Sequence, residues 1–307
     1  MRRLPAVLTA AGLVAVALTG CASSGAPTCD RDVSTDRLAG IVDVTGAVGE
    51  RPEVHVPTPF HASGVEISDL AVGEGTSIVS DRQDLVLGIT VVDGATGELL
   101  AQQGYEALDS VTNVSTWTDA IPALEDALMC ASAGSRVLVG LDSEELGDAG
   151  QALGVESGSS AVFVLDLRKV YLAAADGADQ FNAGWGLPAV VRAPSGQPGI
   201  IVPDGPAPTE TVVQVLKKGD GPVTTDQDSI RINYTNVSWQ TREVGGTSWD
   251  SQPYAYDLSA YTDPLTEALI GQPVGSQLLV VLPPAEGAEA DTQVFVIDIL
   301  GIDGQAD

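Results

Sequence analysis

Few side chains of this 307-residue chain could bind a metal ion or act as a nucleophile. The sequence has three cysteines and two histidines in all: Cys21, Cys29, Cys130, His55 and His61. Structural zinc, haem and iron–sulfur sites draw on several Cys or His ligands, so such sites are nearly excluded and we expect no metal and no cofactor. Both histidines lie in a Pro-containing arm without a carboxylate cluster, where a solvated imidazole is the ordinary case.

A second candidate for metal chemistry is the acidic run that contains Asp142, Glu144, Glu145 and Asp148. It lacks the Gly-punctuated alternation of oxygen ligands that an EF-hand calcium loop needs. We therefore interpret this run as a solvated loop.

Composition bounds the remaining function classes. With 44% hydrophobic and 18% charged residues, the chain has the material for a folded core, and its length fits two ordinary domains. Lys and Arg number 14 against 42 Asp and Glu, which gives a formal net charge of −28. Such a charge repels phosphate backbones and anionic lipid headgroups, so nucleic-acid binding and adsorption to a membrane surface are disfavoured.

The N-terminus predicts an exported protein. A short basic start, Arg2 and Arg3, precedes an apolar run from Leu4 to Leu18 that is too short to span a bilayer but suits a signal peptide. Leu18-Thr19-Gly20-Cys21 resembles a bacterial lipobox, in which the cysteine thiol receives a diacylglyceryl group. We expect a signal peptide over 1–20 and a lipid anchor on Cys21, on the extracytoplasmic face of the cell membrane. The alternative is an ordinary secretory signal with a chance cysteine.

Cys29 and Cys130 then remain, and outside the cytoplasm two thiols in one chain tend to pair. A bridge between them would close a long loop and tie the N-terminal arm, residues 21–63, to the first domain. Two free buried thiols are the alternative.

An internal repeat organises the rest of the chain. Gly73 matches Gly219, Gly134 matches Gly275 and Phe163 matches Phe295, each within a longer similar segment and in the same order. Most of each copy has the alternation and turn residues of strands. One helix per copy is expected, over Asp119–Met129 and Asp263–Ile270, each with an early proline. The fold class is therefore α+β, with two domains that are each an antiparallel sheet and one short helix.

The domain boundaries follow from the repeat. We assign 64–175 to the first domain and 211–307 to the second. Residues 176–210 lie between them, and Gly184 to Pro208 contains six prolines and several glycines. We interpret this stretch as a linker or extended arm that cannot hold a β-ladder.

The second copy carries a set of family motifs. They are Gly219-Asp220-Gly221-Pro222, Ile232 to Thr235, Trp249-Asp250-Ser251, Pro253 to Leu258, Gly271 to Ser276, Val281 to Pro284 and Val294 to Ile297. In this order they resemble an FKBP-type peptidyl-prolyl cis/trans isomerase domain, whose fold is a bent antiparallel sheet wrapped around one short helix. The whole chain resembles an actinobacterial-type lipoprotein with two FKBP-like domains.

The resemblance implies a site that twists a prolyl amide. Tyr234 and Asp250 would be the catalytic residues, with Asp250 near the twisting amide and a backbone N–H near Thr262 as the donor to the carbonyl. The substrate-binding side chains would be apolar or aromatic: Trp249, Tyr254, Leu265 and Phe295. The partners would be proline-containing segments of exported proteins, which the isomerase would help to fold.

The sequence also departs from the family pattern. The loop after Pro284 is short and has no tyrosine where the family places one, and Asn236 replaces a glycine after Tyr-Thr. The first copy is degenerate, since the Tyr234 position falls on Ile89 or Thr90 and no aromatic–Asp pair follows. A catalytically inactive FKBP-like module that binds peptides or acts as a chaperone is therefore the alternative function.

Overall fold

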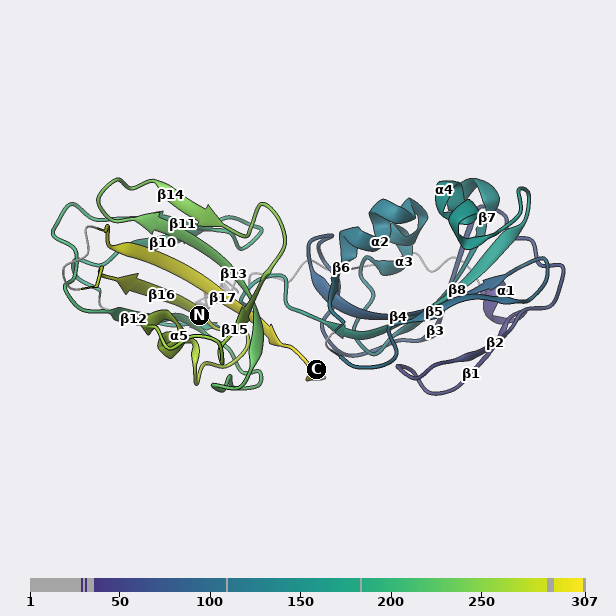
Figure 1. The fold of residues 1–307 in the computed structure, drawn as a ribbon, viewed down its shortest axis with the longest axis horizontal. Coiled ribbons are helices and arrows are strands. Elements are labelled where there is room, and N and C mark those ends of the chain that lie inside the picture. Colours follow the sequence, from purple (N-terminus) through teal and green to yellow (C-terminus); the bar gives the residue numbers. More distant parts are fainter. Residues whose placement is uncertain are drawn as a thin grey trace, which may run out of the picture.

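The computed structural model describes residues 29, 31, 36–108, 110–182, 184–285 and 290–305. These residues form two β-rich domains placed end to end, the first towards the purple and blue side of Figure 1 and the second towards the green and yellow side. The expected signal peptide and Cys21 lie outside the described residues.

The first domain is an antiparallel sheet in the strand order β3-β7-β8-β4-β5, with β6 paired to β4. Its strands are β3 (Val65–Ala71), β4 (Asp84–Asp93), β5 (Leu99–Gln103), β6 (Thr112–Asn113), β7 (Arg136–Asp142) and β8 (Ser160–Val170). The central strand β8 is buried along most of its length, as its continuous Val, Phe and Leu side chains dictate.

The second domain repeats this topology. Its sheet has the order β14-β13-β17-β16-β12-β9, with β15 paired to β13. The strands are β9 (Ala178–Asp179), β12 (Val212–Lys218), β13 (Ser229–Ser238), β14 (Val244–Thr247), β15 (Tyr254–Asp257), β16 (Gln277–Leu282) and β17 (Gln293–Ile302). The α+β fold class, with two domains that are each built on an antiparallel sheet, is confirmed.

The two sheets have equivalent individual hydrogen bonds as well as the same topology. The N–H of Gly73 donates to Ser135 Oγ at 2.9 Å, and the N–H of Gly219 donates to Ser276 Oγ at 3.0 Å. A Cβ on either glycine would come within 2.0 Å of a backbone carbonyl oxygen, so only glycine fits this crossing. The repeat seen in the sequence therefore marks the backbone crossings that both domains require.

The segment between the domains is not the ladder-free linker that we expected. It contains a β-hairpin of β10 (Ala189–Arg192) and β11 (Pro198–Ile201), in which Val190 pairs with Ile200. Pro198 begins its strand, and a missing N–H is tolerated at a strand start on an edge. The hairpin packs with Val190, Ile200 and Val202 against the face of the second sheet formed by Leu279, Val281, Val294 and Val296.

A matching hairpin covers the first domain. It consists of β1 (Asp43–Thr45) and β2 (Glu53–His55), with Val44 opposite Val54. Val44, Val54 and Val56 pack with α1 (Asp36–Ala39) against Val92, Leu138, Val162 and Val164. The Pro-x-Val-x-Val-Pro segment that starts at Pro52 corresponds to the Pro-x-Ile-x-Val-Pro segment that starts at Pro198. The repeat unit therefore begins before the boundaries predicted from the sequence.

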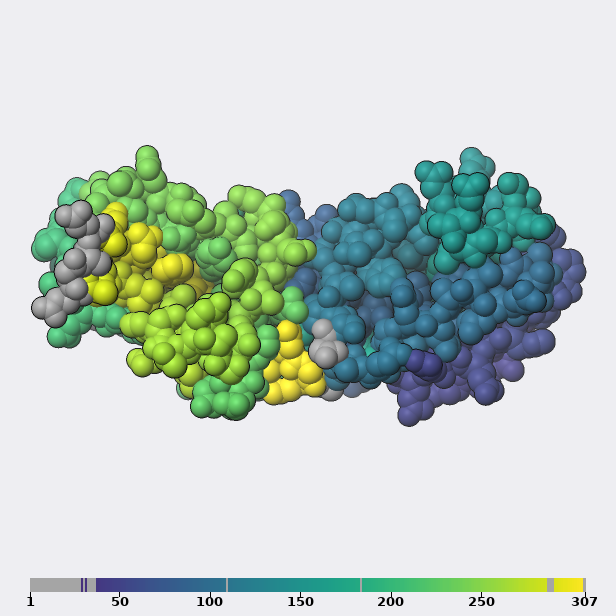
Figure 2. All heavy atoms as spheres, in the orientation of Figure 1, coloured from purple at the N-terminus to yellow at the C-terminus, as the bar shows by residue number. Residues whose placement is uncertain are grey.

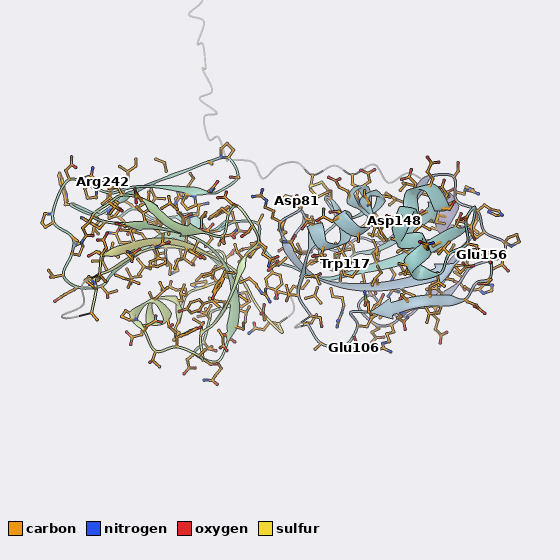
Figure 3. All side chains as sticks on the ribbon, turned by 45° about the horizontal axis from the view of Figure 1, so that its top comes forward. Asp81, Glu106, Trp117, Asp148, Glu156 and Arg242 are labelled. Carbon is orange, nitrogen blue, oxygen red and sulfur yellow. A yellow bond between two sulfur atoms is a disulfide. The ribbon has the colours of Figure 1, made fainter. Side chains whose placement is uncertain are left out.

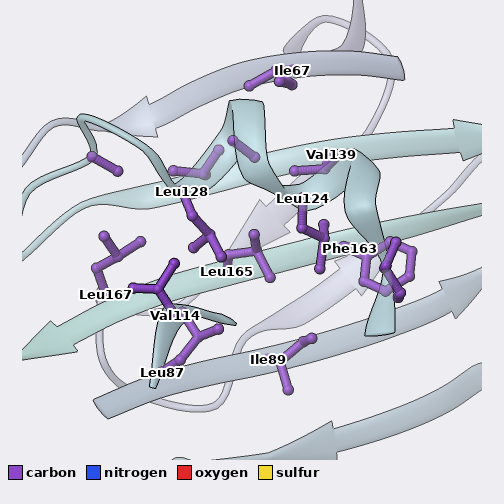
Figure 4. Packing of buried hydrophobic residues seen from close by; sticks show 14 of the residues in the cluster. Ile67, Leu87, Ile89, Val114, Leu124, Leu128, Val139, Phe163, Leu165 and Leu167 are labelled. Atoms are coloured by element: carbon purple, nitrogen blue, oxygen red, sulfur yellow. The ribbon is translucent and has the colours of Figure 1, made fainter. Parts of the chain in front are cut away.

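The helices of the first domain differ from the expectation. The predicted helix Asp119–Met129 is broken into α2 (Val114–Ala120), a 3-10 turn (Pro122–Leu124) and α3 (Glu125–Leu128). Ile121 is extended because a residue that precedes proline avoids the helical region. Figure 4 shows Val114, Leu124 and Leu128 from these segments packed over Leu87, Leu165 and Phe163 of the sheet.

The acidic run that we interpreted as a loop starts a helix, α4 (Ser143–Leu153). The Asp142 carboxylate accepts hydrogen bonds from the N–H groups of Glu144 and Glu145, both at 3.0 Å. Acidic residues at a helix N-terminus complement its partial positive charge, so the run is a capped first turn. In the second domain the expected helix is present as α5 (Pro264–Leu269), capped by Asp263.

A disulfide joins Cys29 to Cys130, with Cα atoms 5.1 Å apart, and so ties the start of the described chain to the end of the helical segment of the first domain. Within the described ranges there is no helix of the length and apolarity needed to cross a bilayer. The same residues contain no cluster of three or more His, Cys, Asp or Glu side chains placed to hold a metal ion.

Candidate active site

Two of the predicted pocket residues lie ring to ring on adjacent strands. Tyr234 is on β13 and Tyr254 is on β15, which pair through Ile232 and Tyr254. Their ring centroids are 6.1 Å apart and the rings are nearly perpendicular, at 84°. An edge-to-face contact of this kind is a favoured aromatic geometry. Tyr254 is 49% exposed, so the pair stands at the surface of the domain.

Leu265 and Phe295 complete the apolar part of the site. Both are half-buried and, together with Tyr234, pack against the core cluster that contains Ile232, Leu258 and Ile297. Leu265 sits in the first turn of α5, which is fixed because the Asp263 carboxylate accepts the N–H groups of Leu265 and Thr266, both at 2.9 Å. The structure thus gathers Tyr234, Tyr254, Leu265 and Phe295 over one side of the second sheet.

The aromatic cluster extends beyond the residues predicted from the sequence. Tyr256 lies 6.3 Å from Tyr254 and 5.6 Å from Tyr261, measured between ring centroids. Alternate residues of a strand point to the same face, so the Tyr254-Ala255-Tyr256 spacing already contained this signal. Burial raises the pKa of Tyr256, whose hydroxyl is 2.9 Å from Thr266 Oγ1. Tyr261 is 51% exposed and lies at the end of the row.

Trp249 does not join this cluster. Its side chain is only 9% exposed, and a Cβ on Gly196 would meet the indole at 3.2 Å and the Ala174 Cβ at 2.6 Å. The indole therefore packs beside the turn of the β10–β11 hairpin and the chain that leaves the first domain. Its Nε1 is buried without a hydrogen-bond partner among the described residues.

The two polar groups predicted for the site are both free to meet a ligand. Asp250 is exposed, and no hydrogen bond to its carboxylate is made by any residue that the structure describes. It lies within a turn closed by the Ser251 N–H, which donates to the Ser248 carbonyl at 3.0 Å. The N–H of Thr262, just before α5, likewise has no partner within the described parts of the chain.

The equivalent positions of the first domain are sealed. Ile89 pairs with Leu165 as Tyr234 pairs with Ile297, so Ile89 is the counterpart of Tyr234. Ile89 is 4% exposed and Phe163, the counterpart of Phe295, is 1% exposed. The extra helix α2 covers this core with Val114 and Trp117. The first domain therefore keeps the scaffold without an open aromatic surface.

A cavity of about 200 Å³ lies elsewhere, where the two domains meet. Its lining includes Lys169, Leu172, Asp176, Pro222 and Ile302, but none of the predicted site residues and no aromatic side chain. A proline ring is held best by aromatic surface, so we place the candidate site at the tyrosine cluster.

Comparison with known proteins shows which proteins the chain is similar to. A protein of Corynebacterium glutamicum described as a probable FK506-binding protein is 29% identical over 114 residues, which is 34% of this chain and 97% of that protein. The chain is therefore similar to an FK506-binding protein over about a third of its length. No family model matches it. The match to a solved structure of the three FKBP domains of wheat FKBP73 covers 78% of this chain and 94% of that one, at 15% identity and a TM-score of 0.34. The putative isomerase FKBP12 of Mycobacterium tuberculosis covers 36% of this chain and 92% of its own, with 24% identity and a TM-score of 0.26.

Proposed function

We propose that the second domain is a peptidyl-prolyl cis/trans isomerase that acts on exported proteins. The observation that carries this proposal is the contact of Tyr234 with Tyr254, since Tyr234 packs on the same core cluster as Leu265 and Phe295. The Thr262 N–H, which has no partner among the described residues, lies three residues before Leu265 in the chain. An aromatic surface can bind the pyrrolidine ring, while a nearby backbone donor can hold the carbonyl of the peptide.

The reaction does not require these residues to break or form a covalent bond. A prolyl amide rotates over a barrier of about 18–20 kcal/mol because the C–N bond has partial double-bond character. The transition state is a twisted amide without resonance, and no bond is broken. A site that binds the twisted amide more tightly than the planar one lowers the barrier, and each ~1.4 kcal/mol of preference gives a tenfold rate. Removing water from the amide favours the twisted form, and Asp250 would interact with its altered charge distribution.

The alternative function, a binder without turnover, has one structural observation in its favour. Trp249 is packed beside the hairpin turn, so the aromatic surface has one member fewer than the family motif implies. Tyr256 and Tyr261 extend the surface on the other side of Tyr254. Both functions need affinity for proline peptides, and only the isomerase needs turnover.

NMR exchange spectroscopy of the full chain with a proline-containing tetrapeptide separates the two functions. We expect exchange between the cis and trans peptide signals to accelerate with wild type, to fall about tenfold or more with Tyr234→Ala, and to fall to a smaller degree with Asp250→Ala. Phe163→Leu in the first domain is the matched control, because it changes the counterpart of Phe295 outside the site. Peptide binding without any acceleration by wild type would leave only the binder.

A further inference from the structure

The turn that carries Asp250 is contacted by the first domain. Arg82, in the loop between β3 and β4, donates from its guanidinium Nη1 to the backbone carbonyl of Trp249 at 2.5 Å. Trp249 directly precedes Asp250, so this bond joins the two domains at the edge of the candidate site. Figure 3 shows Asp81, the neighbour of Arg82 in sequence, where the two domains meet.

The loop that presents Arg82 is held in place by its own domain. The Gln83 side chain is 2% exposed; its Oε1 accepts the Val79 N–H at 2.7 Å and its Nε2 donates to the Tyr171 carbonyl at 2.8 Å. The Arg82 carbonyl accepts Asn113 Nδ2 at 2.6 Å. The guanidinium therefore extends from a fixed backbone rather than from a mobile loop.

The interface around this bond is polar and well paired. Arg231 of β13 lies 3.4 Å from the Asp84 carboxylate of the first domain and 3.0 Å from Asp303. The Tyr171 hydroxyl donates to Asp303 at 2.8 Å, and the Leu172 N–H donates to the Leu300 carbonyl at 3.1 Å. Figure 2 shows the last described residues, in yellow, against the blue surface of the first domain. These contacts hold the two domains together and so fix the distance between the Arg82 backbone and the Trp249 carbonyl.

Within the second domain the turn is held at Ser248, whose Oγ accepts the Tyr234 N–H at 3.0 Å and donates to Asn233 Oδ1 at 2.9 Å. The N–H of Ser248 donates to the Tyr234 carbonyl at 3.0 Å, but Asp250 has no side-chain bond and the Trp249 indole N–H is unpaired within the described chain. The charge-assisted bond from Arg82 to the Trp249 carbonyl adds a restraint from the first domain on the residue directly before Asp250.

We propose that Arg82 is a positioning residue, by which the first domain holds the Asp250 turn of the second domain in its working geometry. This inference rests on the proposed isomerase function. It gives the sealed first domain a role in catalysis without a pocket of its own. Arg82 would touch neither the peptide nor the amide, so its removal should lower the rate on the enzyme more than the affinity for peptide.

The test uses the full chain with Arg82→Met, Arg82→Lys and Arg51→Met. Arg51 is the matched control, since it is an exposed arginine of the first domain that pairs with Glu106. Hydrogen exchange is measured over 247–252, and the peptide dissociation constant and on-enzyme rate are measured by NMR exchange. For Arg82→Met we expect faster exchange of this segment, a rate about fivefold lower, and a dissociation constant within about twofold of wild type. Arg82→Lys should restore most of the rate and Arg51→Met should change nothing.

A double variant that combines Arg82→Met with Asp250→Ala tests whether Arg82 acts through Asp250. If Arg82 acts through Asp250, Arg82→Met should lower the rate no further in the Asp250→Ala background. Unchanged exchange in Arg82→Met, or faster exchange with an unchanged rate, would overturn the proposal. If wild type itself has no turnover, the isomerase function fails, while the exchange data still report whether Arg82 restrains the turn.

Discussion

Two buried aspartates show how strongly burial raises the pKa of a carboxyl group in this acidic protein. Asp298 on β17 is 1% exposed, accepts Gln277 Nε2 at 2.7 Å and accepts the Ala175 N–H at 2.8 Å. Burial nevertheless raises the pKa of Asp298 to about 6. Asp84 at the domain interface has its pKa raised to about 6 by the same cause, against the opposing charge of Arg231. In both cases desolvation outweighs the partners.

The raised pKa of Asp298 therefore predicts that the stability of the protein depends on pH. Between pH 4 and pH 6 the native state keeps a proton that the unfolded state has released, so the free energy of unfolding falls as pH rises through this window. We expect Asp298→Asn to remove up to about 3 kcal/mol of that change. Urea titrations at pH 4, 5, 6 and 7 measure it, with exposed Asp226→Asn as control. Equal pH slopes in wild type and Asp298→Asn would contradict the assignment.

At the scale of elements, the hairpins are part of each domain rather than connections. β1–β2 and β10–β11 cover equivalent sheet faces with equivalent side chains, Val56 in the first domain and Val202 in the second. A hydrophobic sheet face must be covered for the domain to be stable, which explains why the hairpins were kept in both copies.

We therefore expect Val56→Ala and Val202→Ala to cost about 2 kcal/mol each, since each deletes two buried methyl groups and leaves a small cavity. Hydrogen exchange resolved by peptide should show the loss in the first domain for Val56→Ala and in the second for Val202→Ala. Val191→Ala, on an exposed side chain of β10, is the control. A loss of protection spread evenly over both domains would mean that the hairpins do not belong to separate units.

At the scale of the whole molecule, net charge and the proposed anchor act in opposite directions. A formal charge of −28 repels an anionic membrane, so the folded protein should not stay at a bilayer by electrostatics. We propose that an acyl group on Cys21 holds the chain there. Cys21→Ser should abolish incorporation of labelled palmitate in a bacterial host and move the protein from the membrane fraction to the soluble one. Membrane retention of Cys21→Ser at both low and high salt would count against the anchor.

The elements that could be predicted from sequence are those with local signals. Glycines at the crossings, the alternation of strands such as 230–235, and Pro264 after a capping Asp263 each act on their own neighbourhood, so their meaning does not depend on distant residues. The predictions from sequence failed where two local signals compete. Pro122 ended a helix that the apolar pattern continued, Asp142 capped a helix in a run interpreted as loop, and a proline-rich stretch formed a hairpin because its prolines stand at strand ends.

The sequence by itself determined the repeat, the α+β class and the resemblance to FKBP domains, because these follow from residue types at fixed spacing. Only the tertiary structure decided which side chains meet. Tyr234, Leu265 and Phe295 pack on one core cluster and Tyr254 contacts the Tyr234 ring. Trp249, one residue before Asp250, instead packs beside a hairpin that precedes it in the chain by about fifty residues. Which neighbour a side chain selects depends on the surface that other segments leave uncovered, and that competition takes place in three dimensions.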